Sequence, residues 1–444
     1  MFFLKCVFCG KEYSYNSVDY ICPDCGNNLD VIYDYNSIKK KFKIEDLKNN
    51  KNYTIWRYFP ILPYHLPSAI YHLPSLPIGW TPLHKATNLE KTFGLKNLYL
   101  KDDTKTPSCS FKDRASAVVV VKGQELYFTE KRKLRTENQK TTTENHIVYT
   151  TASTGNAGCA LACICANLQL PCVIFVPETA PKGKIAQLLI FGAKVIAVRG
   201  NYDDAFNLSL EASKEFGWYC RSTGYNPYTR EGKKTASYEI VEQLGWKVPD
   251  KVFVPVGDGN ILSGIWKGFL DFYKLGFIDK LPQIIGVQSK NSNAISRAVI
   301  KYERLIYSPK KKSDMKNLDS KKIKIEPVNA NTVADSICVD MPKDGISAVK
   351  SIIESRGFVI EVSDEEILEA VKIIAEKEGI FSEPAGATSF AGLKRLIQQE
   401  ALNPDEDIVC LVTGNGLKDI QSAMKIAGEP IVIEPSLEEL KKHI

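Results

Sequence analysis

Short apolar runs alternate with longer amphipathic stretches along most of the chain from about residue 76. Examples are "HIVYTTASTGNAGCALACICANL", "KVFVPVGDGNILSGIWKGFLDFYKLG" and "QIIGVQSKNSNAISRAV". Each begins with a strand-like run, passes through a turn rich in small residues and continues with helical spacing. This repetition predicts an α/β fold of parallel sheets with helices on both faces. Ligands of such sheets bind at the carboxyl ends of the strands, so the glycine-rich turns are the candidate site loops.

Segments outside this pattern divide the chain further. Residues 1–35 form a small module, 36–75 a polar connector rich in tyrosine and proline, and 431–444 a short tail after the α/β region of residues 76–430. Two charged segments, 122–145 and 301–327, interrupt the pattern and are interpreted as solvated insertions or lids.

Composition limits the possible functions. The chain has 444 residues, of which 44% are hydrophobic and 25% charged, as in an ordinary soluble globular protein. The net charge of +6 is mild and the lysines are scattered, which argues against nucleic-acid binding. The apolar run "ALACICANLQLPCVIFV" is interrupted by Asn167, Gln169 and Pro171, so it predicts a buried helix and strand and no membrane partner. The apolar start "MFFL" is too short for a signal peptide, and we expect a cytoplasmic protein.

Four of the twelve cysteines form two CxxC pairs, each followed by glycine: Cys6, Cys9, Cys22 and Cys25. Thiolates at this spacing can converge on zinc, with glycine allowing the tight turn after each pair. Two disulfides or four unbound thiols are the alternatives. A four-thiolate zinc site would be structural, so the reaction is expected elsewhere.

Four loops carry the candidate chemistry: "SFKDRAS" with Lys112, "TASTGNAG", "VGDGNILSG" and "LVTGNGLKD" with Thr413. Glycine-rich turns that open helices present unpaired backbone N–H groups and suit anions. "VGDGNILSG" is the best phosphate cradle, although it matches neither a P-loop nor GxGxxG. "TASTGNAG" suits a carboxylate. Each loop alone is also compatible with simple turn chemistry.

Together these loops supply a lysine, a phosphate cradle, a carboxylate cradle and a neutral hydroxyl. Pyridoxal phosphate chemistry needs this set, because a lysine amine forms a Schiff base with the cofactor, whose ring then stores electrons from a deprotonated amino acid.

The motifs "PSCSFKDRAS", "ASTGNAG", "PVGDGNILSG", "FSEPAGA" and "TGNGLKD" resemble the tryptophan-synthase-β-like, fold type II family of pyridoxal phosphate enzymes. The resemblance covers residues 75 to 430 and is strongest to the threonine synthases, in which an amino-terminal CxxC…CxxC ribbon also occurs. It implies two doubly wound parallel-sheet domains, a small one of roughly residues 115–215 inserted in the large one, behind a zinc-ribbon-like module. It also implies a possible homodimer.

The resemblance further implies a reaction: O-phosphohomoserine and water become threonine and phosphate by γ-elimination and β-hydration. Lys112 would carry the cofactor and move the substrate's protons. The other implied cofactor contacts are Asn156 at the ring oxygen, Thr413 at the pyridine nitrogen, and the N–H groups of Gly257, Asp258, Gly259, Asn260 and Ile261 at the phosphate. Ser153 and Thr154 would take the substrate carboxylate.

One segment departs from the family's pattern. Threonine synthases usually carry a serine and an arginine for the leaving phosphate just before "EGxKT"; here "RSTGYNPYTREGKKT" has Gly224 and Thr229 in those places. The predicted phosphate partners are therefore Lys182, Lys184 and Arg230. An alternative is β-elimination or β-replacement on another amino acid, as in diaminopropionate ammonia-lyase, Ser/Thr dehydratase or cysteate synthase. A non-catalytic zinc-ribbon protein on an enzyme scaffold is a further alternative.

Overall fold

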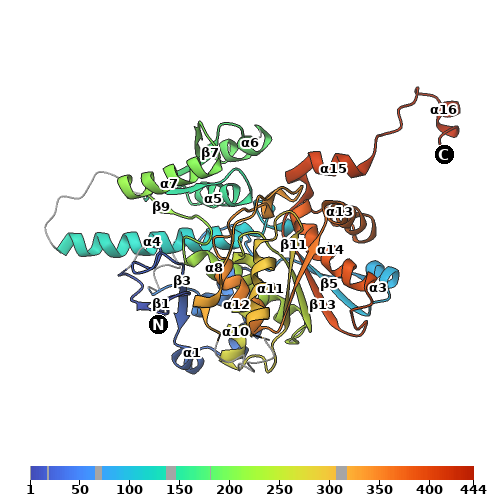
Figure 1. The fold of residues 1–444 in the computed structure, drawn as a ribbon. Helices are drawn as coiled ribbons and strands as arrows, with labels where there is room; N and C mark the ends of the chain where they lie inside the picture. Colours follow the sequence, from blue (N-terminus) through green and yellow to red (C-terminus); the bar gives the residue numbers. More distant parts are fainter. Residues whose placement is uncertain (1, 18–19, 66–72, 137–146, 181, 307–317) are drawn as a thin grey trace.

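Three sheets organise the chain in the computed structural model, which describes residues 2–17, 20–65, 73–136, 147–180, 182–306 and 318–444. A six-stranded sheet has the order β12-β11-β10-β13-β5-β4, and a four-stranded sheet the order β8-β7-β6-β9. The third sheet, β2-β1-β3, belongs to the amino-terminal module. In Figure 1 the four-stranded sheet and its helices lie above the larger sheet, with the long helix α4 between them and the amino-terminal module.

The strands are β1 Phe2–Cys6, β2 Glu12–Tyr13, β3 Leu29–Tyr33, β4 Leu83–Lys85, β5 Asn97–Asp102, β6 Tyr149–Ala152, β7 Cys172–Pro177, β8 Lys194–Val198, β9 Tyr219–Cys220, β10 Lys251–Pro255, β11 Gln283–Ser289, β12 Val359–Val362 and β13 Asp407–Val412. The α-helices are α1 Tyr35–Lys41, α2 Ile44–Lys48, α3 Thr87–Phe93, α4 Lys112–Thr136, α5 Asn156–Asn167, α6 Lys182–Ile190, α7 Tyr202–Phe216, α8 Tyr228–Lys233, α9 Thr235–Gln243, α10 Asn260–Leu275, α11 Ala294–Ile306, α12 Gly345–Glu354, α13 Asp364–Glu378, α14 Pro384–Gln398, α15 Ile420–Ala427 and α16 Leu437–Lys441.

Alternation along the strands of the large sheet feeds two separate cores. In β10, Val252 and Val254 pack with helices α10 and α12, whereas Phe253 packs with α13 and α14 on the other face. The small sheet follows the same rule, since Ile174 of β7 faces α4 and α5 and Phe175 faces α7. Side chains of successive strand residues point to opposite faces, so a sheet covered on both sides buries all of them. The predicted α/β architecture is confirmed.

All four strands of the small sheet are parallel, and in the large sheet only β4 runs antiparallel to its neighbour. Both sheets therefore direct the carboxyl ends of their parallel strands towards loops that can form one site. The predicted boundaries at residues 35, 75, 115, 215 and 430 stay predictions.

The charged segment 122–145 was predicted to be a solvated insertion or lid, and for the part that the structure describes this prediction is wrong. Its first fifteen residues continue α4 to Thr136. Lys122 is fully buried and its Nζ lies 2.5 Å from Glu125 Oε2. The polar pattern was misleading because the two charges neutralise each other inside the protein. Residues 137–146 lie outside the described residues, as do residues 307–317 of the second segment, whose first residues belong to α11.

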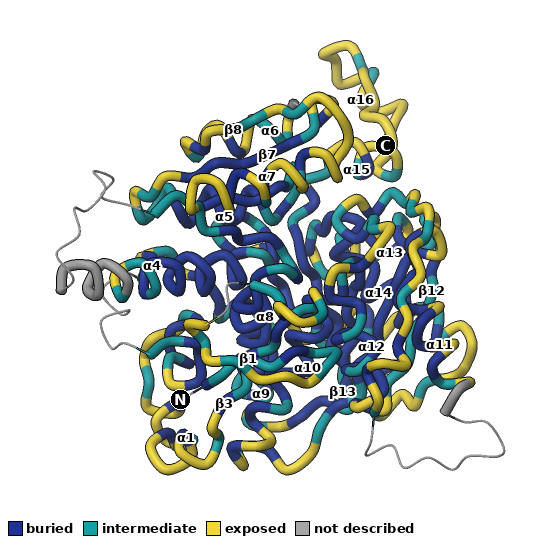
Figure 2. Tube along the Cα trace, turned by 60° about the vertical axis from the view of Figure 1, so that its left-hand side comes forward, coloured by how far each residue is buried: buried dark blue, intermediate teal, exposed yellow. Residues whose placement is uncertain are grey.

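The connector is also more ordered than its composition suggested. It contains α1, α2 and a 3-10 helix, Ile55–Ile61, in which Ile55 and Tyr58 are fully buried. In Figure 2 buried residues are concentrated around α8 and α14, whereas the carboxyl-terminal arm beyond α15 is mostly exposed.

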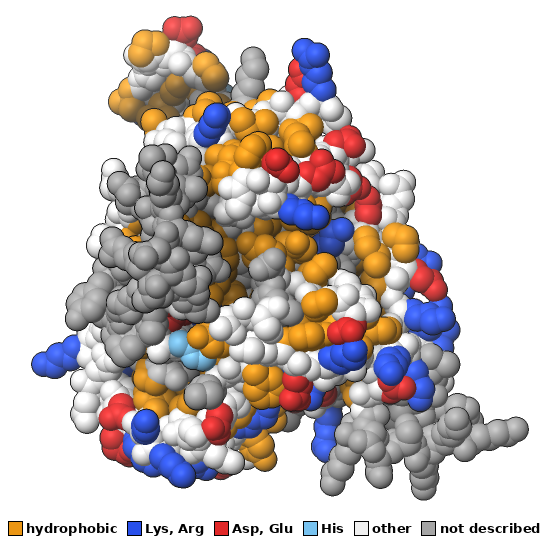
Figure 3. Space-filling view, turned by 90° about the vertical axis from the view of Figure 1, so that its left-hand side faces the viewer, with side chains coloured by type: hydrophobic (Ala, Val, Ile, Leu, Met, Phe, Trp, Pro, Cys, Tyr) orange, Lys and Arg blue, Asp and Glu red, His pale blue; other side chains and the backbone are white. Residues whose placement is uncertain are grey.

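No helix within the described ranges is long and apolar enough to cross a membrane. On the face shown in Figure 3, lysine and arginine side chains lie interspersed with aspartate and glutamate. That face offers no single basic patch of the kind that follows a nucleic-acid backbone.

A buried ion-pair network fastens the start of α4 to the large sheet. Arg114 Nε lies 2.6 Å from Asp103 Oδ2, and its Nη1 lies 2.5 Å from Glu239 Oε1. Lys101 Nζ lies 2.7 Å from the other oxygen of Glu239. Burial would raise the pKa of Glu239, but the two cations lower it to about 2.

Glu239→Ala should lower the free energy of unfolding by about 3–5 kcal/mol, because Arg114 and Lys101 would lose a buried counter-charge. Urea denaturation of the full chain measures this. Glu369→Ala is the matched control, since Glu369 pairs with Lys394 at 2.5 Å but its side chain is 53% exposed. That change should cost less than about 1 kcal/mol. Equal effects of the two substitutions would contradict the role of the network.

Candidate active site

A cavity of about 650 Å³ lies where the carboxyl ends of strands from the small and large sheets meet. Residues that follow β6, β9 and β10 line it, together with the start of α4 and the segment from Ala330 to Lys343. The lining includes the predicted residues Lys112, Ser153, Thr154, Asn156, Gly257, Asp258, Gly259, Asn260 and Ile261. Loops that are far apart in the sequence thus form one wall, as expected for parallel α/β sheets.

Lys112 is the first residue of α4 and is aimed into this cavity from a loop held on two sides. The Phe111 N–H donates to the Thr413 carbonyl at 2.9 Å, and Ser110 forms a bridge with Gly414. Among the described residues, Lys112 Nζ has no hydrogen-bond or ion-pair partner. Burial, reinforced by the positive charge of Arg221, lowers the pKa of Lys112 to about 8. A substantial fraction of the amine is therefore neutral and nucleophilic near neutral pH.

The acid and the arginine behind Lys112 are structural. The Asp113 carboxylate accepts the Ser108 N–H at 2.7 Å and also the Ser108 hydroxyl, which closes the loop before Lys112. Arg114 belongs to the buried network described above. The motif "SFKDR" thus surrounds one reactive amine with two residues that immobilise its backbone.

The phosphate cradle is formed by Gly257 to Ile261 at the start of α10. Gly259 has φ +87°, and a Cβ there would lie 2.7 Å from the Ala348 Cβ, so the position requires glycine. Helix geometry leaves the first N–H groups of α10 without intrahelical partners, and these residues line the cavity. The Asp258 carboxylate accepts the Lys343 N–H at 3.1 Å and so fastens the neighbouring loop.

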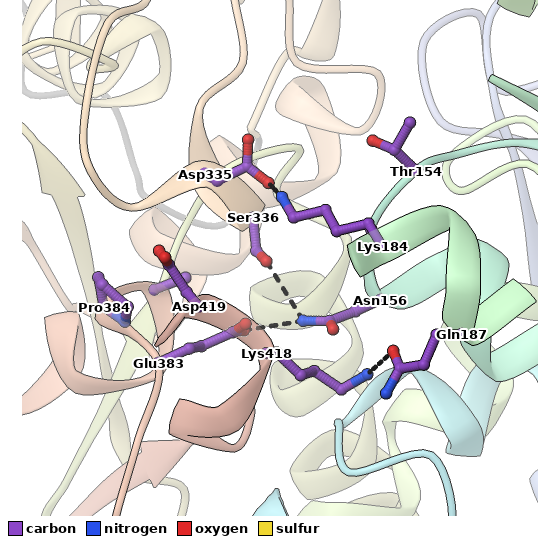
Figure 4. A pocket seen from close by; sticks show the side chains of 12 residues that line it. Thr154, Asn156, Lys184, Gln187, Asp335, Ser336, Glu383, Pro384, Lys418 and Asp419 are labelled. Atoms are coloured by element: carbon purple, nitrogen blue, oxygen red, sulfur yellow. Dashed lines mark hydrogen bonds and ion pairs between the residues drawn. The ribbon is translucent and has the colours of Figure 1, made fainter. Parts of the chain in front are cut away.

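The carboxylate cradle lies opposite, at the start of α5. The Ser153 hydroxyl accepts the Gly155 N–H at 3.2 Å, and no side chain caps this helix, so its N–H groups face the cavity. Figure 4 shows Asn156 reaching across to the large sheet's loops. Its amide donates to Glu383 at 2.8 Å and to Ser336 at 3.2 Å. Burial raises the pKa of Glu383.

Thr413 lies one residue beyond β13 and is only 6% exposed, directly behind the loop that carries Lys112. Its carbonyl accepts the Phe111 N–H, and it is not among the residues that line the cavity. Its predicted contact with a pyridine nitrogen stays a prediction.

Arg221 and Lys233 are the functional candidates that sequence reasoning missed. Arg221 is fully buried, its Nε and Nη1 donate to Ser116 and Thr223, and Nη2 has no partner among the described residues. Lys233 lines the cavity and donates to Asn260 Oδ1 at 2.6 Å. Burial, followed by repulsion from Lys112 and Arg221, holds the pKa of Lys233 well below its usual value. Both lie in the unusual stretch "RSTGYNPYTREGKKT", which was the available signal.

A model of the pyridoxal-phosphate dependent enzyme family matches residues 74–414. The chain belongs to this family. Threonine synthase from Methanocaldococcus jannaschii is 39% identical over 439 residues, covering 99% of this chain and 98% of that protein. Threonine synthase from Methanosarcina acetivorans is 37% identical and covers 100% of this chain and 99% of that protein. The chain is a pyridoxal-phosphate dependent lyase of the threonine synthase kind.

Solved structures of the same fold support the architecture. The processed form of threonine deaminase isoform 2 from Solanum lycopersicum has a TM-score of 0.60 and 22% identity, covering 78% of this chain and 86% of that one. Diaminopropionate ammonia lyase from Escherichia coli has a TM-score of 0.61 and 19% identity, covering 86% and 92%. At these identities the likeness shows the fold alone.

Arg230 was predicted to bind the leaving phosphate, but its side chain lies outside the cavity. Its guanidinium is 4% exposed, lies outside the cavity's lining and is engaged by Asp30 at 2.7 Å and Asp344 at 2.6 Å. Both partners are carboxylates, so the positive charge of Arg230 is already paired. Arg230 faces the amino-terminal module instead.

Of the two other predicted phosphate partners, Lys184 is not among the residues that line the cavity. Lys184 pairs with Asp335 in a smaller neighbouring pocket, which Figure 4 shows between α6 and the loops that carry Asp335 and Lys418. The side chain of Lys182 lies outside the described residues.

The residues present fit pyridoxal phosphate on three observations. The Lys112 amine lines the cavity and has no partner among the described residues, the tightly packed Gly259 keeps the cradle free of side chains, and Arg221 Nη2 is a buried donor that no described residue satisfies. A phosphate group in the cradle and an aldehyde at Lys112 would meet each of these requirements.

The four cysteines of the CxxC pairs also come together, with their Sγ atoms all within 4.8 Å of one another. Two of the Sγ–Sγ distances are 3.4 Å, for Cys6 and Cys25, and 3.6 Å, for Cys9 and Cys22. A tetrahedral zinc with bonds of about 2.3 Å has sulfur–sulfur edges of about 3.8 Å, close to these values. All twelve cysteines are free thiols, so the predicted alternative of two disulfides is not what the structure has.

The attachment of cofactor to Lys112 should depend on pH with a midpoint near 8. The neutral amine is the reactive form, so a lowered pKa makes attachment rise through pH 8 and not two units higher. Full-length protein freed of cofactor would be mixed with pyridoxal, and the rate of the visible absorbance change measured against pH. Arg221→Met should raise the midpoint by removing a neighbouring positive charge, whereas Arg221→Lys should leave it in place. A midpoint near 10 in the unaltered protein would contradict this assignment.

Proposed function

We propose that this chain is a threonine synthase that converts O-phosphohomoserine and water into threonine and phosphate. The observation that carries the proposal is a cavity lined by Lys112 and Lys233, with the buried Arg221 directly before the lining residues Ser222 and Thr223. Burial raises the pKa values of the two nearby acids, Asp258 and Glu383, and weakens them as counter-charges. Buried positive charge is costly unless paired, and two phosphate groups, from cofactor and substrate, would pair it.

When bound at Lys112, pyridoxal phosphate supplies an electron sink for the carbanion formed at the substrate's Cα. The N–H groups of residues 257–261 would hold the cofactor's phosphate, and Asn156 and Thr413 would lie along its ring. Ser153, Thr154 and the start of α5 would orient the substrate carboxylate. The Lys112 amine, with its lowered pKa, would remove the Cα proton and then a Cβ proton.

Arg221 and Lys233 would stabilise the phosphate as it leaves Cγ, with the hydroxyls of Ser222 and Thr223 beside them in the cavity wall. Arginine suits this role because its planar fork can donate two parallel hydrogen bonds to phosphate. Its Nη2 is the donor that lacks a partner. The charge is already in place before the substrate binds, so little reorganisation is needed when the leaving group departs.

We also propose that Cys6, Cys9, Cys22 and Cys25 bind a structural zinc ion in a zinc-ribbon-like module. Their spacing in space fits a tetrahedral site, and Gly10 and Gly26 have φ +77° and +69° in the turns after the two pairs. A three-stranded module of this size has a small core and gains stability from a metal.

A cytoplasmic location is proposed from the twelve free thiols, because disulfides are rare in reducing compartments. A homodimer is proposed on the support of the carboxyl-terminal arm, where Ile431, Val432, Leu437 and Ile444 are exposed. The partners would then be a small phosphorylated amino acid and a second copy of the chain.

Full-length, cofactor-loaded protein should release phosphate and threonine in equal amounts from O-phosphohomoserine. Lys112→Ala should abolish both, because the amine that carries the cofactor and moves the protons is removed. Arg221→Met should raise the KM for O-phosphohomoserine by about tenfold or more, since a charged hydrogen bond to phosphate is lost. Arg221→Lys, which keeps the charge, should be impaired less. Phosphate and threonine would be measured by coupled assay and chromatography.

One outcome would overturn the substrate and favour the alternative reaction. If the protein binds cofactor and gains visible absorbance, but releases ammonia from serine or diaminopropionate and no phosphate from O-phosphohomoserine, it is a β-eliminating lyase.

The purified full chain should contain about one zinc per molecule by elemental analysis. Cys22→Ser should lose the metal, because a hydroxyl is a poor zinc ligand. Cys338→Ser, at a partly buried cysteine outside the cluster, should retain it. Zinc content equal in both variants would rule out the four-cysteine site.

A further inference from the structure

Arg230 connects three parts of the chain through one buried guanidinium. Its Nη1 donates to Asp30 of β3 at 2.7 Å, and its Nη2 donates to Asp344 at 2.6 Å. Its Nε donates to Ser263 of α10 at 3.1 Å. The amino-terminal module, helix α8 and the loop before α12 are thus tied together at a single point that is 4% exposed.

Asp344 also contacts the residues of the phosphate cradle. Its Oδ2 accepts from Asn260 Nδ2 at 2.8 Å and from Ser263 Oγ at 2.7 Å, both in the first turn of α10. Its N–H donates to the Asp258 carbonyl at 3.0 Å, on the other side of Gly259. The loop of Asp344 therefore holds the residues on both sides of Gly259 in the cradle.

The amino-terminal module reaches the same loop directly. Asn28 Nδ2 donates to the Lys343 carbonyl at 2.5 Å and to Asp344 Oδ1 at 3.3 Å. Asn28 is three residues beyond Cys25, and Asp30 is five beyond it. Asp30 also accepts from Lys267 of α10 at 2.6 Å. The cysteine cluster is therefore only a few residues along the chain from the side chains that contact the loop of the cradle.

We propose that the amino-terminal module positions the cofactor-phosphate cradle through Asn28, Asp30, Arg230 and Asp344, so that metal binding at the cysteine cluster sets the affinity for the phosphate group. This inference rests on the proposed function, since the cradle is taken to hold pyridoxal phosphate. A cradle of backbone N–H groups binds an anion well only when its geometry is held in advance. Arg230 acts through Asp344 and is a positioning residue.

Comparison of pyridoxal phosphate with pyridoxal isolates the cradle, because the two share the aldehyde that attaches to Lys112 and differ by the phosphate. Full-length protein freed of cofactor would be titrated with each, using visible absorbance. Asp30→Asn should weaken the binding of pyridoxal phosphate by about tenfold, because a charged hydrogen bond is lost, and leave the affinity for pyridoxal unchanged. A variant that merely loosened the whole site would weaken both.

Asn28→Ala is the second variant, because Asp30→Asn leaves Arg230 and Lys267 with less counter-charge and can fold poorly. Asn28→Ala removes no charge, and it should weaken the binding of pyridoxal phosphate by about three- to tenfold. Glu12→Gln is the control in the same module, since the ion pair of Glu12 with Lys5 lies at an exposed position, and it should change neither affinity.

Zinc removal by a chelator should weaken the binding of pyridoxal phosphate to the unaltered protein, and added zinc should restore the affinity. In Asp30→Asn the same treatment should have a smaller effect, because the connection is already broken. An unchanged preference for pyridoxal phosphate over pyridoxal in both variants and without zinc would overturn the inference. Failure of the unaltered protein to bind either compound at Lys112 would overturn the proposed function instead.

Discussion

Positive charge buried around one cavity is the constraint on which the rest of the structure depends. Lys112, Arg221 and Lys233 come from three different elements; Arg221 and Lys233 are almost fully buried, and Lys112 is half-buried in the cavity wall. Such a cluster is costly, because burial lowers the pKa values of all three groups and repulsion by neighbouring cations adds to the shift at Lys112 and Lys233. It can persist only if the surrounding protein is rigid enough to hold the charges until anions arrive. The same desolvation keeps the Lys112 amine partly neutral, so one physical cause serves both anion binding and proton transfer.

Helix α8 is the element that supplies this rigidity. Within four residues, Arg230 binds the amino-terminal module, Glu231 binds Lys267 at 2.6 Å, and Lys233 faces the cavity. Between them Gly232 lies against the backbone of α4, where a Cβ would come within 2.0 Å of the Arg114 carbonyl oxygen. The helix that carries Lys112 and the helix that carries Lys233 are therefore in direct backbone contact. Glycine permits this approach, and ion pairs on both sides hold it.

The sequence predicted the loops well and the partners of charged residues poorly. Strand–turn–helix alternation was enough to place Lys112, Asn156 and the Gly257–Ile261 cradle at one site, because parallel sheets direct their carboxyl ends to a common edge. Arg230 was predicted to bind phosphate, yet it pairs with Asp30 and Asp344, which lie 200 and 114 residues away. Long-range pairing of this kind leaves no local pattern. Arg221 was overlooked for the converse reason, since only the fold shows that no acid among the described residues forms an ion pair with it.

The amino-terminal module shows how a small domain can affect a distant reaction. Its sheet joins three short strands whose buried apolar side chains share one core with α8, α10 and β10, and charged and polar contacts add to this interface. A module with so small a core needs a metal or its neighbour to stay folded. The energy that orders Asn28 and Asp30 must therefore come from the cysteine cluster, from the catalytic region, or from both. Because Asp344 receives hydrogen bonds from the module's side and from Asn260 of the cradle, loss of order at one end removes support at the other.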